Sequence, residues 1–94
     1  MLRIESLEID DQILDKIESK HGVTFEDVEE ACLSEGRYVR RSREGLYKLF
    51  SHITAGRYIL VVLLNLGKGC WKIVTAREMA DSEKRLYTKA TGGK

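Results

Sequence analysis

The chain has 94 residues, of which 43% are apolar and 33% are charged, and this composition indicates one folded domain and excludes a disordered chain. It contains no apolar run of the roughly 18 residues that a transmembrane helix needs. Residues 1–10 lack the basic and then apolar pattern of a secretory signal. We therefore expect a single domain over residues 1–94, located in the cytoplasm and not in a membrane.

The net charge of +1 conceals a division between the two parts of the chain. Residues 1–35 contain 3 Lys/Arg and 11 Asp/Glu, whereas residues 36–94 contain 13 Lys/Arg and 4 Asp/Glu. The basic part is suited to attract a polyanion, and the acidic part to repel it or to bind a basic partner. Simple mutual neutralisation of acidic helices by a basic sheet explains the division equally well.

The first part of the chain predicts two short helices. A short strand over residues 2–4 is followed by apolar side chains that recur at helical spacing from Ile9 to Ile17, and Gly22 is a typical helix stop. Thr24 and Asp27 then have the spacing of a capping box, which indicates a second helix ending near residues 34–36. The two helices should form a hairpin.

After Gly36 the pattern changes to strands separated by glycine turns. We expect strands over residues 37–43, 46–54, 57–66 and 70–75, and a last helix from Asp81 to about Lys89. The third of these strands is nearly continuously apolar, which indicates a central position in the sheet. The predicted fold class is α+β, with an N-terminal helical hairpin, a four-stranded antiparallel twisted sheet and a C-terminal helix.

Motifs for nucleotide binding, serine hydrolysis or zinc proteolysis are absent from the sequence. Cys32 and Cys70 do not stand at metal-ligand spacing, so we expect two reduced thiols, no metal and no cofactor. The second part of the chain instead combines arginines with tyrosines and a tryptophan. Guanidinium groups bind phosphate, and aromatic rings stack on the bases of single-stranded RNA. Composition alone also allows an ordinary solvated basic surface.

Two segments are distinctive: KHGVTFED at residues 20–27 and IVTAREMADSEKRLY at residues 73–87. The first resembles the KHGVxFxxA segment, and the second the I-[IV]-[ST]-A-R ending with a following E-R-x-x-Y, of BrnT-type toxins, a family of ribonuclease toxins from bacterial toxin–antitoxin pairs. The entry into the third strand, Gly56-Arg57-Tyr58, is also similar. The order and spacing of these elements agree over residues 9–89. The tryptophan-containing pattern that usually precedes KHG in the family is missing here.

The resemblance implies a RelE-like fold, cleavage of RNA without metal, and neutralisation by a cognate antitoxin, with a homodimer or a heterotetramer as the compatible assemblies. It implies that Arg77 stabilises the phosphate, that Arg85 and Tyr87 lie near it, and that His21 is a base or a phosphate contact. We predict further RNA contacts from the cationic residues Lys72, Arg57, Lys84 and Lys20.

Several of these residues also have a purely structural interpretation. His21 is suited to end a helix, Arg77 to pair with a nearby acid, and Tyr87 to anchor the last helix. His52, beside Phe50 on a strand, is predicted to be structural. Two other functions therefore remain open: a non-catalytic protein-binding module on the same fold, such as a decayed toxin or a regulatory partner, and a simple nucleic-acid-binding domain.

Overall fold

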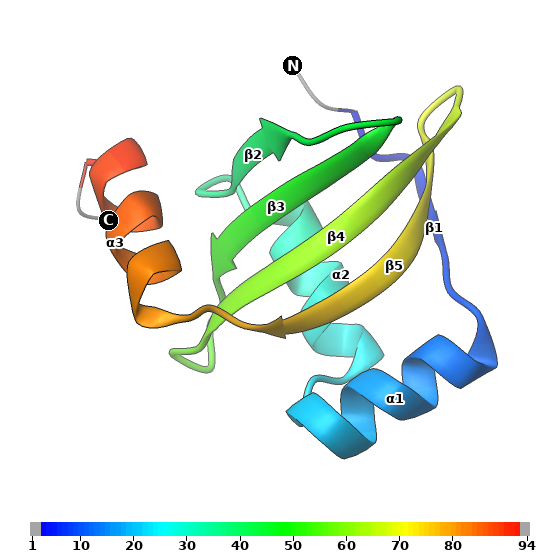
Figure 1. Cartoon of the computed structure of the whole chain (residues 1–94), viewed down its shortest axis with the longest axis horizontal. Coiled ribbons are helices and arrows are strands. Elements are labelled where there is room, and N and C mark those ends of the chain that lie inside the picture. Colours follow the sequence, from blue (N-terminus) through cyan, green and yellow to red (C-terminus); the bar gives the residue numbers. More distant parts are fainter. Residues whose placement is uncertain (1–2, 93–94) are drawn as a thin grey trace.

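The computed structural model describes residues 3–92 (Figure 1), and these residues form an α+β fold in which a helical hairpin precedes a sheet and a last helix follows it. This confirms the predicted fold class. In chain order the elements are β1 (Ser6–Glu8), α1 (Asp11–His21), α2 (Phe25–Leu33), β2 (Tyr38–Arg41), β3 (Leu46–His52), β4 (Tyr58–Gly67), β5 (Cys70–Glu78) and α3 (Asp81–Ala90).

The sheet differs from the prediction in its number of strands. It has five strands in the order β1-β5-β4-β3-β2, and β1 pairs parallel to β5, so the sheet is mixed and not purely antiparallel. The strand expected over residues 2–4 is wrong for the described residues 3 and 4, because the strand begins at Ser6; residue 2 lies outside the described residues. A three-residue edge strand has no periodicity from which it could be recognised.

The helical hairpin forms as its capping residues predict. Gly22 follows α1 with φ 63°, a left-handed conformation that glycine adopts without a steric penalty, and its N–H reaches the carbonyls of the last turn. The Thr24 hydroxyl accepts from the Asp27 N–H, while the Asp27 carboxylate accepts from the Thr24 N–H. This reciprocal capping box fixes the start of α2 directly after the turn.

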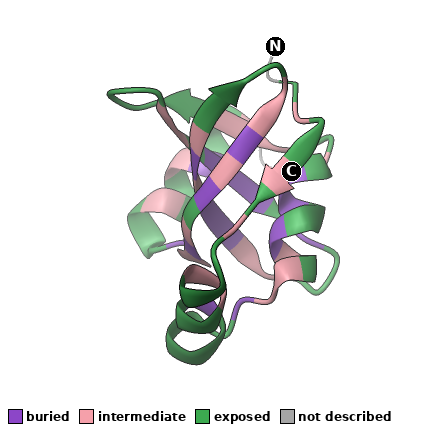
Figure 2. Cartoon of the chain, turned by 90° about the vertical axis from the view of Figure 1, so that its right-hand side faces the viewer, coloured by how far each residue is buried: buried purple, intermediate pink, exposed green. Residues whose placement is uncertain are grey.

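The main core lies between the sheet and the helical hairpin. It contains Ile17 and Val28 from the helices, and Leu49, Val61 and Ile73 from the strands, all fully buried. The side chains of β3 alternate between the two faces of the sheet, so Leu49 faces this core while Phe50 faces the other side. Figure 2 shows the buried residues concentrated in the strands, with the outer faces of the helices exposed.

A bulge in β5 changes which face its later residues occupy. Val62 pairs with Thr75 and Leu63 pairs with Ile73, so Val74 is an extra residue without a partner, and it is 37% exposed. Continuous alternation would have put Arg77 on the same face as Ile73, toward the helical hairpin. Because of the bulge, Ala76 joins the main core and Arg77 turns to the opposite face.

Helix α3 packs on that opposite face through a second, smaller core. Phe50, Leu60, Met79 and Tyr87 are buried together there. The helix therefore covers only one end of this face, where β3 and β5 finish and β4 begins (Figure 1). Within residues 3–92, no helix is long and apolar enough to cross a membrane.

Candidate functional site

The sheet face that carries α3 contains a groove beside the helix. Strand pairing places Arg40 opposite Lys48 and Lys48 opposite Val62, one row away from the Phe50–Leu60 row that α3 covers. The groove has a volume of about 310 Å³, and it is lined by Arg40, Arg41, Ser42, Lys48, Phe50, Glu83 and Leu86. It is thus bounded by β2 and β3 on one side and by α3 on the other.

The charge of this groove is predominantly positive. Arg40, Arg41 and Lys48 are exposed, and none of them forms an ion pair within the part of the chain that the structure describes. Glu83 is the acidic group in the lining, and its charge is already shared with Arg77. Three uncompensated cations on a concave surface attract a polyanion and can bind phosphate oxygens.

Arg77 holds Glu83, one of the residues that line the groove, in a bidentate pair. Its Nη1 is 2.7 Å from Oε1 of Glu83 and its Nη2 is 2.8 Å from Oε2, while Nη1 also donates to the Glu78 carbonyl at 3.1 Å. Glu83 Oε1 in addition accepts from the Ala80 N–H at the start of α3. The pair therefore fastens α3 to the end of β5, as its structural interpretation anticipates.

The pair also sets the protonation state of Glu83. Hydrogen bonds from Arg77 lower the pKa of the Glu83 carboxyl below its usual value of 4.5, against the opposing effect of burial, and the nearby Lys48 lowers the pKa further. The same hydrogen bonds raise the pKa of Arg77. At neutral pH the groove accordingly contains a carboxylate anion that can accept a proton, surrounded by guanidinium and ammonium groups.

Arg57, a predicted phosphate contact, is bound on several sides by the protein itself. Its Nε is 2.7 Å from Glu78 Oε2, its Nη1 is 3.2 Å from Asp27 Oδ2 and 2.8 Å from the Gly22 carbonyl, and its Nη2 donates to the His21 carbonyl at 3.4 Å. Arg57 thus links the α1–α2 turn to the end of β5. These contacts give Arg57 a structural role.

His21 and Lys20 lie in the last turn of α1, on the helical-hairpin side of the sheet. Both are exposed. Arg77 faces α3 on the other side, because it pairs with Leu60 of the second core. The structure therefore does not bring His21 and Arg77 together, and His21 is separated from the groove by the sheet.

The remaining predicted residues are divided between the two ends of the sheet. Lys72, half-buried on β5, forms an ion pair with Asp10 at 3.3 Å, beside the start of α1. Lys84 and Arg85 are exposed on α3, near Arg77 and Glu83 in the chain and in space. Of the predicted set, Arg77, Lys84, Arg85 and Tyr87 are thus gathered around α3.

Tyr87 is 2% exposed, and its hydroxyl donates to the Gly36 carbonyl at 2.8 Å. Burial raises the pKa of Tyr87, and a backbone hydrogen bond from His52 opposes this increase. A buried phenol that stays protonated and bonded to a carbonyl anchors α3 to the loop before β2. This geometry fits the anchoring interpretation of Tyr87.

None of the residues that line the groove is among the predicted site residues, and its four charged members, Arg40, Arg41, Lys48 and Glu83, were therefore all missed. The signal for Lys48 is present in the sequence, because it stands between Leu46 and Phe50 on the strand face that does not pack on the helical hairpin. Glu83 lies within the matched E-R-x-x-Y segment, but a carboxylate next to a phosphate site is not expected from charge alone.

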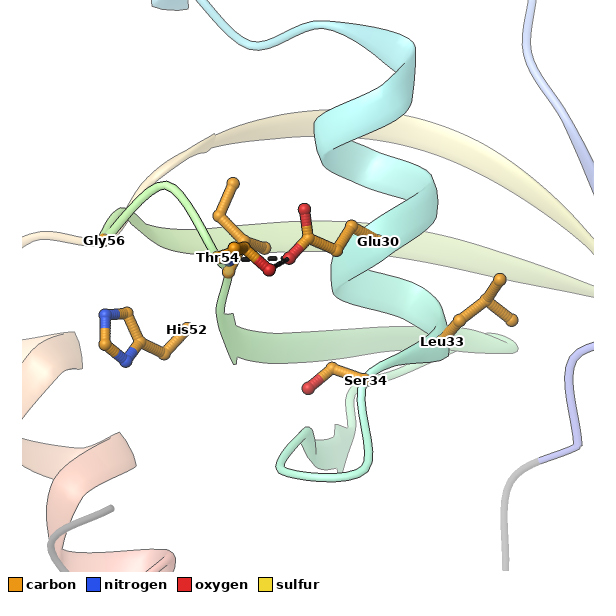
Figure 3. Close-up of a pocket in the computed structure, with 7 residues that line it drawn as sticks. Glu30, Leu33, Ser34, His52, Thr54 and Gly56 are labelled. Carbon is orange, nitrogen blue, oxygen red and sulfur yellow. Dashed lines mark hydrogen bonds between the residues drawn. The ribbon is translucent and has the colours of Figure 1, made fainter.

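A second hollow, of about 630 Å³, lies at the other end of β3 (Figure 3). It is lined by Glu30, Leu33, Ser34, His52, Ile53, Thr54 and Gly56. The Glu30 carboxylate accepts hydrogen bonds from the backbone N–H and the hydroxyl of Thr54, which joins α2 to the β3–β4 turn. Figure 3 shows the His52 ring pointing away from this pair, toward the side of α3.

Within residues 3–92, no three His, Cys, Asp or Glu side chains gather in a geometry that could hold a metal ion. Cys32 is buried and Cys70 is half-buried, and both are free thiols. The cationic groove is the strongest candidate site among the described residues.

Comparison with known proteins identifies the fold. The sequence matches no protein-family model and no curated protein. The structure is similar to the crystal structure of BrnT, the ribonuclease toxin of Brucella abortus, with a TM-score of 0.67 over 81% of this chain and 97% of the toxin, at 15% sequence identity. This likeness confirms the fold that the sequence motifs imply, and the chain therefore has the fold of a BrnT ribonuclease toxin.

Proposed function

We propose that this chain is a metal-independent endoribonuclease toxin of a type II toxin–antitoxin pair. The single observation that carries the proposal is the groove beside α3, in which Arg40, Arg41 and Lys48 form no ion pair with any described residue and lie close to the Arg77–Glu83 pair. The shared fold with a ribonuclease toxin and the sequence motifs around Arg77 support it.

Cleavage of RNA without metal requires three groups. A base removes the proton of the 2′-hydroxyl, cations stabilise the negative charge that develops on the phosphorus oxygens, and an acid protonates the leaving 5′-oxygen. The attack of the 2′-oxygen on phosphorus and the departure of the 5′-oxygen would leave a 2′,3′-cyclic phosphate. No external oxidant, reductant or metal is needed.

The groove offers groups for each role. Glu83, anionic at neutral pH, is suited to accept the 2′-hydroxyl proton. Arg40, Arg41 and Arg77 are suited to stabilise the phosphate, since a guanidinium can contact two phosphate oxygens at once. Lys48, which faces Glu83, is suited to donate the proton to the leaving oxygen. Arg85 and Lys84, exposed on α3, would guide the RNA toward the groove.

The test is cleavage of a labelled single-stranded RNA by purified protein in the presence of EDTA, together with growth arrest when the protein is expressed in bacteria. We expect Arg77→Lys to slow cleavage at least ~100-fold, because an ammonium cannot reproduce the bidentate contacts. The fold should be retained, which circular dichroism checks. A wild-type protein that is harmless and leaves RNA intact would refute the proposal.

The second candidate is a non-catalytic protein-binding module on the same fold. The Arg77–Glu83 pair favours it, because a cation satisfied by the protein itself is not available to a phosphate. This alternative predicts a stable complex with the product of a neighbouring gene and no cleavage of RNA. Cleavage by a preparation free of other proteins excludes it.

The proposed antitoxin would use the acidic helical hairpin. Asp11, Asp15, Glu18, Glu26 and Glu29 are exposed on α1 and α2 and form no ion pairs in the described part of the chain. A basic segment of the antitoxin is complementary to this surface. Co-expression with the adjacent open reading frame should abolish growth arrest and yield a complex whose dissociation is accelerated by salt.

A further inference from the structure

A pair of stacked rings lies at the end of the sheet, on the side of α3 away from the cationic groove. His52 ends β3 and Tyr58 begins β4, and the two residues are direct cross-strand partners. Their ring centroids are 4.3 Å apart and the ring planes are inclined by 4°. The two rings therefore lie face to face, one on the other, on the face of the sheet that carries α3.

The Tyr58 ring of the stack is held in place by a contact with Tyr87. Tyr58 contacts Tyr87 edge to face, with centroids 6.0 Å apart, and Tyr87 is fixed by its hydrogen bond to the Gly36 carbonyl. Tyr58 is half-buried, whereas His52 is exposed. Tyr58 is thus packed against the second core, and the His52 imidazole is the outer ring of the stack.

The His52 imidazole stacks on the Tyr58 ring and makes no polar contact within residues 3–92. No described residue forms a hydrogen bond or an ion pair with the His52 ring. A planar group that is rigid, exposed and covered on one face is available for stacking on the other. The cross-strand stack gives His52 the structural role that was predicted for it, but that role does not require the second face of the imidazole to be exposed.

The ammonium group of Lys84 lies near the stacked rings. Lys84 Nζ lies 5.8 Å from the Tyr58 ring centroid, and Lys84 forms no ion pair within residues 3–92. Arg85, next to it on α3, is also exposed and unpaired in the same range. An aromatic plane beside free cations is the arrangement with which proteins bind single-stranded nucleic acid, since rings stack on bases and cations contact phosphates.

We propose that the His52–Tyr58 stack is a base-stacking platform for single-stranded RNA, with Lys84 contacting the adjoining phosphate. A strand that passes over the first turn of α3 would place one base on His52 and continue toward the groove of Arg40, Arg41 and Lys48. The inference rests on the proposed function for its ligand, single-stranded RNA, but it concerns binding and not cleavage. Stacking tolerates any base, so the platform adds affinity and sets the distance to the cut without specifying a sequence.

The test is binding of an uncleavable RNA to the full chain. The probe is a short, fluorescein-labelled, fully 2′-O-methylated RNA of mixed sequence, compared with a second probe that has the same phosphates and abasic sites in place of the bases. We expect His52→Ala to weaken binding of the first probe by about five- to tenfold, near the lower end of the effect of losing one base–aromatic stack. The abasic probe should bind wild type and His52→Ala equally.

Two further variants separate stacking from folding. His52→Phe restores a ring and should bind the intact RNA within about twofold of wild type. Leu66→Ala, which shortens an exposed apolar side chain at the opposite end of β4, is the matched control and should leave binding unchanged. Because each variant is compared on both probes, a loss of folded protein lowers both signals and cancels in their ratio.

The outcomes also distinguish this inference from the proposed function. Equal binding of the intact RNA by wild type and His52→Ala overturns the platform, as does an equal loss on the abasic probe or binding of neither probe by wild type. If the stack binds a protein partner and not RNA, His52→Ala and wild type will bind the intact RNA equally. A wild-type protein that passes this test but cuts no unmodified RNA retains the platform and loses the proposed catalysis.

Discussion

The Arg77 guanidinium donates two hydrogen bonds to the Glu83 carboxylate, from Nη1 to Oε1 at 2.7 Å and from Nη2 to Oε2 at 2.8 Å. A guanidinium binds a phosphate in the same bidentate geometry. The carboxylate therefore occupies the position on Arg77 that an RNA phosphate would need. Glu83→Gln removes the charge while its side-chain oxygen can still accept from the Ala80 N–H. We expect this variant to bind uncleavable RNA more tightly, by about three- to tenfold, because a free guanidinium is added to the groove.

The same variant should lose activity. If Glu83 accepts the 2′-hydroxyl proton, Glu83→Gln lowers kcat by at least ~100-fold even though KM falls. Steady-state cleavage of a labelled RNA measures both constants. A variant that binds tightly and cleaves as fast as wild type would show that Glu83 is only a competitor for Arg77 and not the base.

The pH dependence of stability provides an independent measure of this pair. Arg77 lowers the pKa of Glu83 below 4.5 in the folded protein, so the folded state binds fewer protons at that site than the unfolded state. The stabilisation is present above pH 4.5 and is lost as the pH falls through the lowered value. Hydrogen bonds from Thr54 also lower the pKa of Glu30, so its contribution to stability is likewise lost as the pH falls.

Urea unfolding between pH 6 and pH 3 should therefore show a steeper decline for wild type than for Glu83→Gln. At neutral pH the variant should be less stable by only about 1 kcal/mol, since the pair is partly exposed to solvent. Parallel declines for the two proteins would mean that Arg77 does not perturb Glu83.

The extent of the sequence-based prediction is clearest at Arg77. The last strand was predicted over residues 70–75, but it runs on through Arg77 to Glu78. The helix after it was predicted from the residue pattern, and a role for Arg77 was implied by the family resemblance. The bulge at Val74 was not predicted, because an extra residue in a strand leaves no distinct mark in an alternating pattern. That bulge decides that Arg77 faces α3, and hence that it meets Glu83 and not the α1–α2 turn.

The same limit applies to the other site residues. The similarity of the KHG segment to a toxin family drew attention to His21, but the contacts of its carbonyl with Arg57 are three-dimensional and could not be read from spacing. By contrast, the position of Lys48 on the same strand face as Phe50 follows from the simple alternation of β3. Which residues lie on one strand face was thus predictable, while which helix covers that face was not.

Arg57 should matter for stability more than for RNA binding. Its contacts with Glu78, Asp27 and the Gly22 carbonyl join the α1–α2 turn to the end of β5. We expect Arg57→Ala to lower the free energy of unfolding by about 2 kcal/mol, because several charge-assisted hydrogen bonds are lost at a half-buried site. Arg57→Lys should recover less than half of this lost free energy of unfolding, since one ammonium cannot contact all three partners.

Denaturant unfolding measures these changes, and the affinity for the uncleavable RNA is the accompanying control. Folded Arg57→Ala should bind that RNA within about twofold of wild type, because its exposed surface is not part of the groove. A large loss of affinity for the RNA, with an unchanged free energy of unfolding, would show that Arg57 contacts the phosphates.

Ser51 is an unusual member of the main core. It is fully buried, and its hydroxyl has no hydrogen-bond partner among the described residues. Ser51→Ala removes the unsatisfied hydroxyl without adding volume, so the unfolding free energy should stay the same or rise by up to about 1 kcal/mol. A loss of more than about 1 kcal/mol, measured by urea unfolding, would reveal a bonded hydroxyl.

The two cysteines should differ strongly in reactivity. Burial raises the pKa of the Cys32 thiol to about 12, whereas Cys70 is half-buried on β5. Because the thiolate is the reactive form, iodoacetamide at pH 8 should alkylate Cys70 in the folded protein and reach Cys32 only on unfolding. Peptide mass spectrometry identifies the modified residue, and prompt labelling of Cys32 would contradict its buried position in the core.

The most direct measurement of the central claim is the chemistry of the cut. Purified protein is incubated with a labelled single-stranded RNA and EDTA, and the ends of the products are identified by mass spectrometry. Cleavage through the groove of Arg40, Arg41, Lys48 and Glu83 predicts 2′,3′-cyclic phosphate ends, no cut at a 2′-O-methylated position, and loss of both products and growth arrest in Arg77→Lys. RNA that remains intact, or cleavage that stops in EDTA, would contradict a metal-independent ribonuclease.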